Sequence, residues 1–285
     1  MEKGPSRTAV RTAIHRAAHL LLDGNPKILT DKFAGAFAGY GSDADLLHAL
    51  ETLKLFDPPR MRAVCTVRNR YAEDELEGAF RRGVAQYVIL GAGLDSFAYR
   101  RPERIASVEV FEIDHPTSQA WKRARVAELG IAPPPRLHHL PIDFERQTLT
   151  EGLVAGGLDR KIPALFAVLG VAQYLTQDAL SQMLRDIAET SAPGSELVMQ
   201  YVAPLESLET SEAALAQALA KRAVESGERW LSFYEPVEME RRLREAGFGA
   251  ISQFGRDVAT ERYLRNRTDG LTLPAYFQMT KAQVG

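Results

Sequence analysis

The chain has 285 residues, of which 45% are apolar and 25% charged, as in ordinary globular proteins. Its 35 Lys and Arg residues nearly balance 37 Asp and Glu residues, which argues against the basic face of a nucleic-acid-binding protein. A single cysteine, Cys65, excludes a disulfide framework and a cysteine-rich zinc site. We find no signal-peptide pattern and no apolar run of the ~18 residues that a membrane-spanning helix needs. These features predict a cytoplasmic protein that binds neither nucleic acid nor membranes.

The first 80 residues predict helices and no strand. Apolar residues recur at helical spacing, and Gly24-Asn25-Pro26 ends the first helix. We interpret residues 1–82 as an N-terminal helical cap and residues 83–285 as the core domain. The expected helices of the cap lie at 8–22, 29–39, 44–56 and 60–82.

From residue 83 onward, short apolar runs typical of buried strands alternate with helical stretches. Such alternation indicates an α/β fold with a parallel sheet wound by right-handed crossovers. The alternation is interrupted at 204–230, which is rich in Ala and Glu, too long for a loop, and interpreted as a helical lid insertion. The strands are expected at 86–90, 107–114, 136–142, 164–169, 196–202, 248–255 and 273–280, and the helices at 117–129, 146–155, 176–191 and 236–246.

Ligand-binding residue types follow the first three strands. Gly91-Ala92-Gly93 comes directly after the first strand, Asp114 ends the second and Asp143 ends the third. Ligands of open α/β sheets bind at the carboxyl ends of the strands, where glycines permit close approach and a carboxylate can accept hydrogen bonds from both ribose hydroxyls. Asp143, with Phe144 beside the ring, could take an adenine amino group. As the alternative, both aspartates also suit helix-capping or turn roles.

This set of residues suits an adenosine-containing ligand, either S-adenosylmethionine or a nicotinamide dinucleotide. The third glycine of a dinucleotide fingerprint would fall at Ser96, so that fingerprint is incomplete. Its absence favours S-adenosylmethionine, because no pyrophosphate has to approach a helix N-terminus.

Together these motifs resemble the leucine carboxyl methyltransferase type of S-adenosylmethionine-dependent methyltransferases, specifically its bacterial branch. The order and spacing of the motifs match from about residue 7 to residue 202, and the similarity is only general thereafter. The matching stretches are 67–71, 88–100, 110–116, 140–144 and 169–175.

The resemblance implies a Rossmann-like class I methyltransferase sheet of seven strands, with the last strand antiparallel and with an N-terminal helical extension over the cofactor. It implies that Gly91 and Gly93 line the methionine part of S-adenosylmethionine and that Asp114 holds the ribose. It also implies that Asp143 and Phe144 hold the adenine.

The family has an arginine before the first strand that binds the cofactor carboxylate. Arg68 matches this position best, and Arg70 is the alternative. The family often has an acidic residue before the glycine that follows the fourth strand, but here Leu169 precedes Gly170. We therefore expect Gly170 in the cofactor site, with backbone carbonyls near the cofactor's ammonium group.

These observations predict an S-adenosylmethionine-dependent O-methyltransferase that acts on a carboxylate or hydroxyl of a small metabolite or peptide. A carboxylate is nucleophilic at pH 7 without a base, whereas a hydroxyl requires one, and His115 is then the first candidate. Tyr174 follows the fourth strand and could face the acceptor. An NAD(P)-dependent oxidoreductase and a non-catalytic cofactor-binding protein are the alternatives. His15 and His19 have zinc-compatible helical spacing but no evident third ligand, so we expect no metal.

Overall fold

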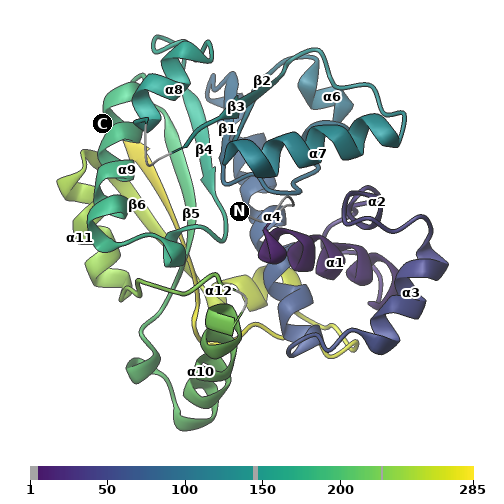
Figure 1. Cartoon of the computed structure of the whole chain (residues 1–285). Coiled ribbons are helices and arrows are strands. Elements are labelled where there is room, and N and C mark those ends of the chain that lie inside the picture. The colour runs from purple at the N-terminus through teal and green to yellow at the C-terminus, as the bar shows by residue number, and fades with distance from the viewer. Residues whose placement is uncertain (1–5, 144–146, 226) are drawn as a thin grey trace.

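In the computed structural model, residues 6–143, 147–225 and 227–285 are described. They form a seven-stranded sheet in the order β3-β2-β1-β4-β5-β7-β6 (Figure 1). Strands β1 to β5 pair in parallel, and β7 runs antiparallel to both β5 and β6. This confirms the class I methyltransferase sheet with an antiparallel last strand. The strands are β1 (Gln86–Leu90), β2 (Glu109–Asp114), β3 (Leu137–Pro141), β4 (Ala164–Val168), β5 (Glu196–Val202), β6 (Phe248–Gly255) and β7 (Phe277–Val284).

Helices cover both faces of the sheet. Every residue of β1, β4 and β5 is buried, as expected for central strands with helices on each side. Successive strand residues face opposite ways, so Ile89 joins the core with α1, α4 and α7 while Val88 joins the core with α8, α9 and α11. The α-helices are α1 (Arg7–Leu22), α2 (Ala34–Phe37), α3 (Asp43–Thr52), α4 (Pro58–Arg81), α5 (Phe97–Arg100), α6 (Pro102–Ile105), α7 (Pro116–Glu128), α8 (Leu149–Ala155), α9 (Gln177–Thr190), α10 (Thr210–Glu225), α11 (Pro236–Glu245) and α12 (Arg256–Ala259).

The N-terminal helices form a layer beside the carboxyl ends of the strands. Helix α1 begins at a cap in which the Ala9 N–H donates to the Ser6 hydroxyl over 3.1 Å. It packs against α2 and α4, and α4 in turn packs on β4 and β5. The long helix α4 therefore connects the N-terminal helices to the sheet. The domain division at residue 82 stays a prediction.

Several element boundaries differ from the sequence prediction. The helix expected at 29–39 is reduced to α2, because the Asp31 carboxylate accepts the N–H groups of Phe33 and Ala34 and forms a turn first. The last strand begins at Phe277 rather than near 273, because the Phe277 N–H closes a turn onto the Pro274 carbonyl at 3.1 Å. Helices α5, α6 and α12 were not predicted, and each has only four residues.

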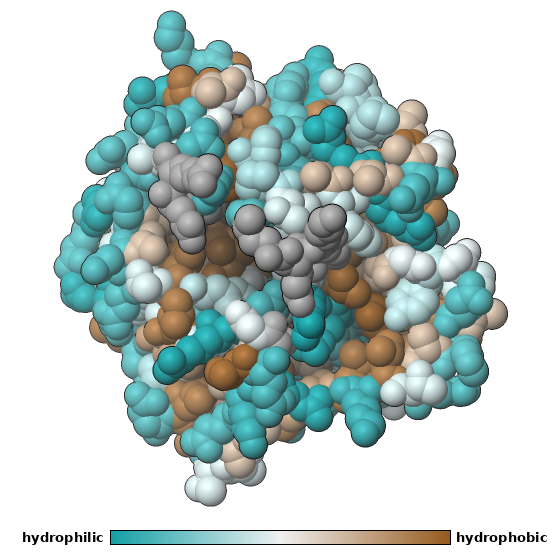
Figure 2. All heavy atoms as spheres, viewed as in Figure 1, coloured by the Kyte–Doolittle hydropathy of each residue, from teal (hydrophilic) through white to brown (hydrophobic). Residues whose placement is uncertain are grey.

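The segment expected as a lid contains a short 3-10 turn, η2 (Leu205–Ser207), followed by α10. Helix α10 lies at the bottom of Figure 1, apart from the helices that cover the sheet. Hydrophilic side chains cover most of the same view, and apolar ones gather in its recessed parts (Figure 2). None of the described helices is long and apolar enough to span a membrane.

Candidate active site

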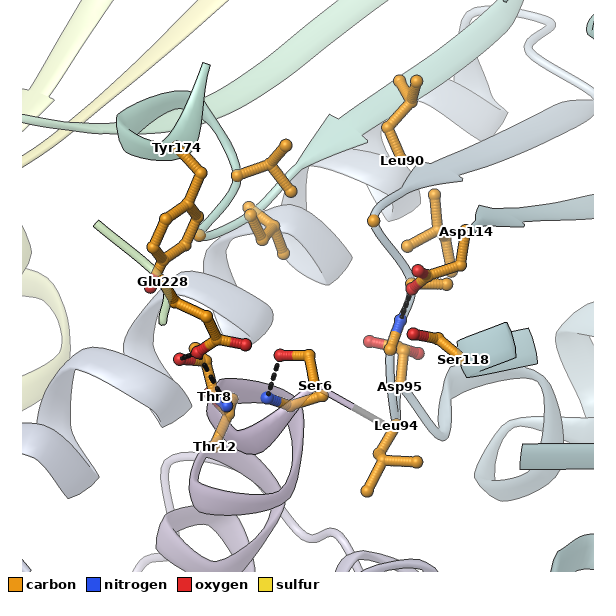
Figure 3. A pocket seen from close by; sticks show the side chains of 18 of the residues that line it. Ser6, Thr8, Thr12, Leu90, Leu94, Asp95, Asp114, Ser118, Tyr174 and Glu228 are labelled. Atoms are coloured by element: carbon orange, nitrogen blue, oxygen red, sulfur yellow. Dashed lines mark hydrogen bonds between the residues drawn. The ribbon is translucent and has the colours of Figure 1, made fainter. Parts of the chain in front are cut away.

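A cavity of about 540 Å³ lies at the carboxyl ends of the central strands. Its walls come from the loops after β1 and β4, from α1 and α4, and from residues 227–231 after α10. Asp114 and Tyr174 lie at opposite ends of this cavity (Figure 3). A cavity of this volume is suited to a cofactor-sized ligand.

The glycine loop after β1 is fixed in a conformation that only glycine adopts without strain. Gly91 and Gly93 have φ angles of 65° and 50°, and a Cβ on Gly91 would approach Val171 Cγ2 to 2.4 Å. The Gly93 N–H donates to Asp114 Oδ2 over 2.5 Å, and the His115 N–H donates to Asp114 Oδ1 over 2.7 Å. The structure thus brings three predicted residues, Gly91, Gly93 and Asp114, to one end of the cavity.

Burial affects the pKa of the Asp114 carboxyl more strongly than its hydrogen bonds do. Desolvation raises the pKa of Asp114, although the N–H groups of Gly93 and His115 oppose that shift. Each carboxylate oxygen accepts only one of these bonds and retains a second lone pair for a ligand hydroxyl.

Asp143 follows β3 at the same edge of the sheet, where Asp114 pairs with Pro141. It is not among the described residues that line the 540 Å³ cavity. Phe144 lies outside the described residues. The adenine-binding role of these two residues therefore stays a prediction.

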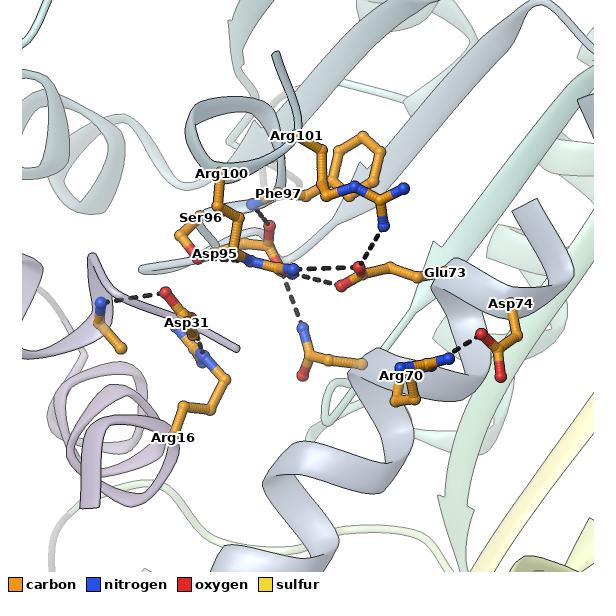
Figure 4. Close-up of polar contacts among 12 residues, drawn as sticks. Arg16, Asp31, Arg70, Glu73, Asp74, Asp95, Ser96, Phe97, Arg100 and Arg101 are labelled. Carbon is orange, nitrogen blue, oxygen red and sulfur yellow. Dashed lines mark hydrogen bonds and ion pairs between the residues drawn. The ribbon is translucent and has the colours of Figure 1, made fainter. Parts of the chain in front are cut away.

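A buried ion pair below the glycine loop was missed in the sequence. Arg16 Nε donates to Asp31 Oδ2 over 2.8 Å (Figure 4). Arg16 Nη2 donates to the Leu94 carbonyl over 2.6 Å. Both side chains are almost fully buried. Helix α1 thereby fixes the backbone of the loop, and the signal in the sequence was a charged residue within the apolar stripe of 8–22.

A second set of buried contacts joins the loop to α4. Asn69 Nδ2 donates to Asp95 Oδ2 over 3.0 Å, while the Phe97 N–H donates to Asp95 Oδ1 over 2.7 Å. The buried carboxylate of Glu73 pairs with Arg100 one turn further along (Figure 4). The conformation of the loop is therefore fixed by side chains from two helices that precede it in the chain.

The two candidate arginines of α4 have different surroundings. Arg68 lines the cavity, its Nη1 donates to Gln200 Oε1 over 3.0 Å, and its buried Nε has no hydrogen-bond partner among the described residues. Arg70 is exposed, and its Nε donates to Asp74 over 2.7 Å (Figure 4). The structure brings Arg68, and not Arg70, to the cavity.

The loop after β4 lies against Arg68. Gly170 has a φ of 74°, and a Cβ there would come within 2.4 Å of Arg68 Nη1. Leu169 also lines the cavity, at the position where the resemblance suggested an acidic residue.

A carboxylate enters the cavity from the segment after α10. Glu228 lines the cavity and accepts hydrogen bonds from both the backbone N–H and the hydroxyl of Thr8 (Figure 3). No sequence pattern near residue 228 indicated this, because the approach of α1 and residues 227–231 depends on contacts distant in the chain.

The two candidate catalytic residues, Tyr174 and His115, lie in different surroundings. Tyr174 lines the cavity, whereas His115 is exposed at the N-terminus of α7, where its Nδ1 accepts the Thr117 N–H over 3.3 Å. Among the zinc-compatible pair, His19 is engaged by Asp23 at 2.8 Å and by the Ile28 N–H at 3.0 Å. Within the described parts of the chain, no three potential ligands form a metal site.

A second cavity of about 120 Å³ adjoins the first. The two share Thr8, Thr12, Arg68, Gly170 and Tyr174 as lining residues. The remaining walls of the second cavity come from α1, α4, α10, β5, residues 54–56, Gln173, Trp230 and Tyr276. Two adjoining compartments of unequal size can hold two ligands on either side of the shared residues.

Comparisons with known proteins agree with this geometry. The family model described as leucine carboxyl methyltransferase matches residues 9–188. The "Putative S-adenosyl-L-methionine-dependent methyltransferase YktD" of Bacillus subtilis is 31% identical over 207 residues, which cover 72% of this chain and 67% of that protein. A "Putative S-adenosyl-L-methionine-dependent methyltransferase" of Mycobacterium avium is 36% identical over 147 residues, 52% of this chain and about half (49%) of the relative.

Solved structures support the fold. A "putative methyltransferase" from Thermobifida fusca has a TM-score of 0.55 at 17% identity, covering 99% of this chain and 96% of that one. A DUF574 family protein from Streptomyces avermitilis has a TM-score of 0.60 at 16% identity, covering 99% and 98%. The family match decides between the cofactors left open by the strand-end residues, in favour of S-adenosylmethionine. The chain belongs to the leucine carboxyl methyltransferase family and is an S-adenosylmethionine-dependent methyltransferase.

Proposed function

We propose that this enzyme methylates an oxygen atom of a small acceptor, with a carboxylate favoured over a hydroxyl. The observation that supports this most directly is the pair of adjoining cavities, which share Tyr174 and Arg68 as lining residues. The larger compartment suits the cofactor, and the smaller one suits an acceptor that reaches the same junction.

The groups that line the larger cavity fit S-adenosylmethionine. Asp114 offers acceptors for the ribose hydroxyls at one end, and Arg68 offers a buried, unpaired Nε–H for the cofactor carboxylate at the other. Glu228 supplies a carboxylate for the ammonium group, in place of the acidic residue that Leu169 replaces. The sequence predicts backbone carbonyls there, and Glu228, from the segment after α10, is proposed in their place.

The remaining cofactor contacts are proposed from the strand ends. The backbone of Gly91, Gly93 and Gly170 lines the cavity and permits close approach of the methionine part. Asp143 and Phe144 are proposed to hold the adenine at the end of β3.

Bound S-adenosylmethionine supplies an electrophilic methyl group on a positively charged sulfur. The protein's own contribution is to align the acceptor oxygen and to exclude water from the junction. Tyr174 lies at that junction and is proposed to orient the acceptor by its hydroxyl.

A carboxylate acceptor is favoured because the described walls of the smaller cavity offer only a poor base. Burial, together with the charges of Arg62, Arg68 and Arg11, lowers the pKa of His15 to about 3, so His15 takes a proton only weakly at neutral pH. His115 lines neither cavity, and its Nδ1 accepts the Thr117 N–H. An acceptor that arrives already ionised needs neither residue.

Two measurements test this proposal. Calorimetric titration should show saturable binding of S-adenosylhomocysteine and no comparable binding of NAD or NADP. Incubation of S-adenosylmethionine with matched carboxylic acids and phenols should give methyl esters, which release methanol in base, rather than stable ethers. Cofactor binding without methylation of any acid or hydroxyl compound would instead favour the non-catalytic alternative.

A further inference from the structure

Buried polar atoms without hydrogen-bond partners gather around the smaller cavity. Among the described residues, three such side-chain atoms belong to residues that line it, besides the Arg68 Nε that is proposed to bind the cofactor carboxylate: His15 Nδ1, Gln173 Oε1 and Trp230 Nε1. His15 is 4% exposed and Gln173 is 6% exposed. Unsatisfied buried polar groups are rare in native proteins and costly, so their gathering at one cavity indicates a site that a polar ligand completes.

The charge around this cavity has a single sign. Arg11, Lys54, Arg68 and Arg222 line it, and no Asp or Glu occurs among its described lining residues. The whole chain has more acidic than basic residues, 37 against 35, so composition does not explain the bias. A cavity lined by one sign of charge concentrates ligands of the opposite sign.

The walls of the cavity are apolar and partly aromatic. The Trp230 ring lies 6.1 Å from the Tyr276 ring in an edge-to-face arrangement, and the Arg222 guanidinium lies 5.2 Å from the Phe56 ring centre. All four side chains line the cavity, together with Val64. Its volume of about 120 Å³ admits a ring-sized body rather than an extended chain.

From these three observations we propose that the smaller cavity binds the methyl acceptor and that this acceptor is a small acid with a planar apolar body. The inference rests on the proposed O-methyltransferase function and specifies its substrate class. The acceptor's carboxylate oxygen forms a bond to the methyl carbon as the sulfur–methyl bond breaks, and the electron pair of that bond stays on sulfur. The carboxylate and sulfonium charges cancel, so an ester forms and no proton is released.

The chain contains a built-in reporter for this cavity. It has two tryptophans, and Trp121 lies on α7, outside both cavities. In the Trp121→Phe protein, fluorescence reports on Trp230 alone. We expect benzoate to quench this fluorescence saturably. The affinity read from the quenching should be at least tenfold higher for benzoate than for benzamide or benzylamine, and higher than for a tripeptide with a free C-terminus.

Charge variants in the same background test the electrostatic part of the inference. Arg11→Gln should weaken benzoate binding at least threefold, because it removes a cation from the cavity wall. Arg185→Gln is the matched control, since Arg185 is exposed on α9 and lines neither cavity. Arg11→Gln should leave S-adenosylhomocysteine binding unchanged, because Arg11 does not line the larger cavity.

The outcomes separate this inference from the proposed function. Saturable quenching by acids, with ester formation and no proton release in a pH-indicator assay, supports both. Binding of S-adenosylhomocysteine without preference for benzoate over benzamide, or with tighter binding of the tripeptide, overturns the small-acid inference and leaves O-methylation standing. Acid binding that never leads to an ester, with a phenol methylated and one proton released per turnover, overturns it as well. Absence of S-adenosylhomocysteine binding overturns the proposed function itself.

Discussion

The two ends of the larger cavity are built in different ways. At the sheet end, Asp114 and Asp95 accept backbone N–H groups from residues close to them in the fold, and their geometry is set without any ligand. At the helix end, Arg68 keeps an unpaired buried Nε, and Glu228 arrives from a segment distant in the chain. The comparison teaches that the sheet end is set by its own backbone hydrogen bonds, whereas the helix end keeps an unpaired donor that the proposed cofactor carboxylate would complete.

The ion pair beneath the sheet end should produce the largest effect on stability. Asp31→Ala leaves Arg16 buried without its carboxylate partner, which typically costs about 3–5 kcal/mol. Urea unfolding measures this loss. The control is Glu245→Ala, which removes an exposed i, i+4 partner of Arg241 and should cost at most about 1 kcal/mol. Equal costs for the two variants would contradict the claim that the loop is fixed by this buried pair.

Cofactor affinity should depend most strongly on Asp114. On the proposed placement, Asp114→Ala removes the acceptors for two ribose hydroxyls, at roughly 1.5–3 kcal/mol for each charge-assisted bond, so the affinity for S-adenosylhomocysteine should fall about a hundredfold or more. Calorimetry checks this, and near-ultraviolet circular dichroism checks folding. A change below threefold in a folded variant would remove Asp114 from the site. Asp143→Ala, measured in parallel, tests the adenine contact at the next strand end.

The two arginines of α4 allow a matched comparison at the helix end. Arg68→Ala should weaken S-adenosylhomocysteine about tenfold or more, because the cofactor carboxylate loses a buried guanidinium. Arg70→Ala should change the affinity less than twofold, since Arg70 is exposed and paired with Asp74. Side chains two positions apart on a helix do not share a face, so only one can serve. Similar, small losses for both variants would contradict the proposed placement of the cofactor carboxylate.

The buried histidine that lines the smaller cavity, His15, gives stability a pH dependence. The pKa of His15 is about 3 in the folded chain and 6.5 when unfolded, so the unfolded state binds more protons between these values. Its contribution is therefore complete above pH 6.5 and is lost as the pH falls toward 3, by at most about 1.4 kcal/mol per pH unit. Unfolding measured at pH 7.5 and 5 should show a smaller acid loss in His15→Asn than in the parent protein. An identical loss in both would show that His15 is not buried in its neutral form.

The residues of the sheet end can be predicted from the sequence more completely than those of the helix end, and the reason is physical. Gly91, Gly93 and Asp114 lie at the ends of strands, and a parallel sheet places the carboxyl ends of its strands at one edge. For the residue that binds the cofactor carboxylate, the family resemblance favours Arg68 over Arg70. Only the packing of α4 shows which of the two side chains faces the cavity. Glu228 and the wall at Trp230 depend on how a segment more than 200 residues from α1 packs against it, which no local pattern encodes.

The smallest expected effect concerns the segment 204–230 as a lid over the helix end. Within α10, Ala216 is the only residue that is fully buried among those described, and polar contacts such as Arg222 to the Lys54 carbonyl connect the helix to its neighbours. Few buried apolar contacts imply a low free energy of local opening, so amides of 210–225 should exchange faster than those of α9. S-adenosylhomocysteine and an acid together should slow that exchange severalfold, because closure excludes water from the junction.

Glu228→Gln sharpens this last test. It keeps the size of the side chain but weakens the bonds that Thr8 donates to a carboxylate, so exchange at 210–225 should rise in the ligand-free protein while α9 is unchanged. Glu238→Gln is the matched control, because Glu238 pairs with Arg242 within α11 and does not touch α1. Slow exchange of 210–225 without ligands, unaltered by either ligand or by Glu228→Gln, would show a permanently docked helix. In that case the difference between the two ends of the cavity would lie in their unpaired polar atoms alone, and acceptor selection would follow from a rigid wall instead of a closing one.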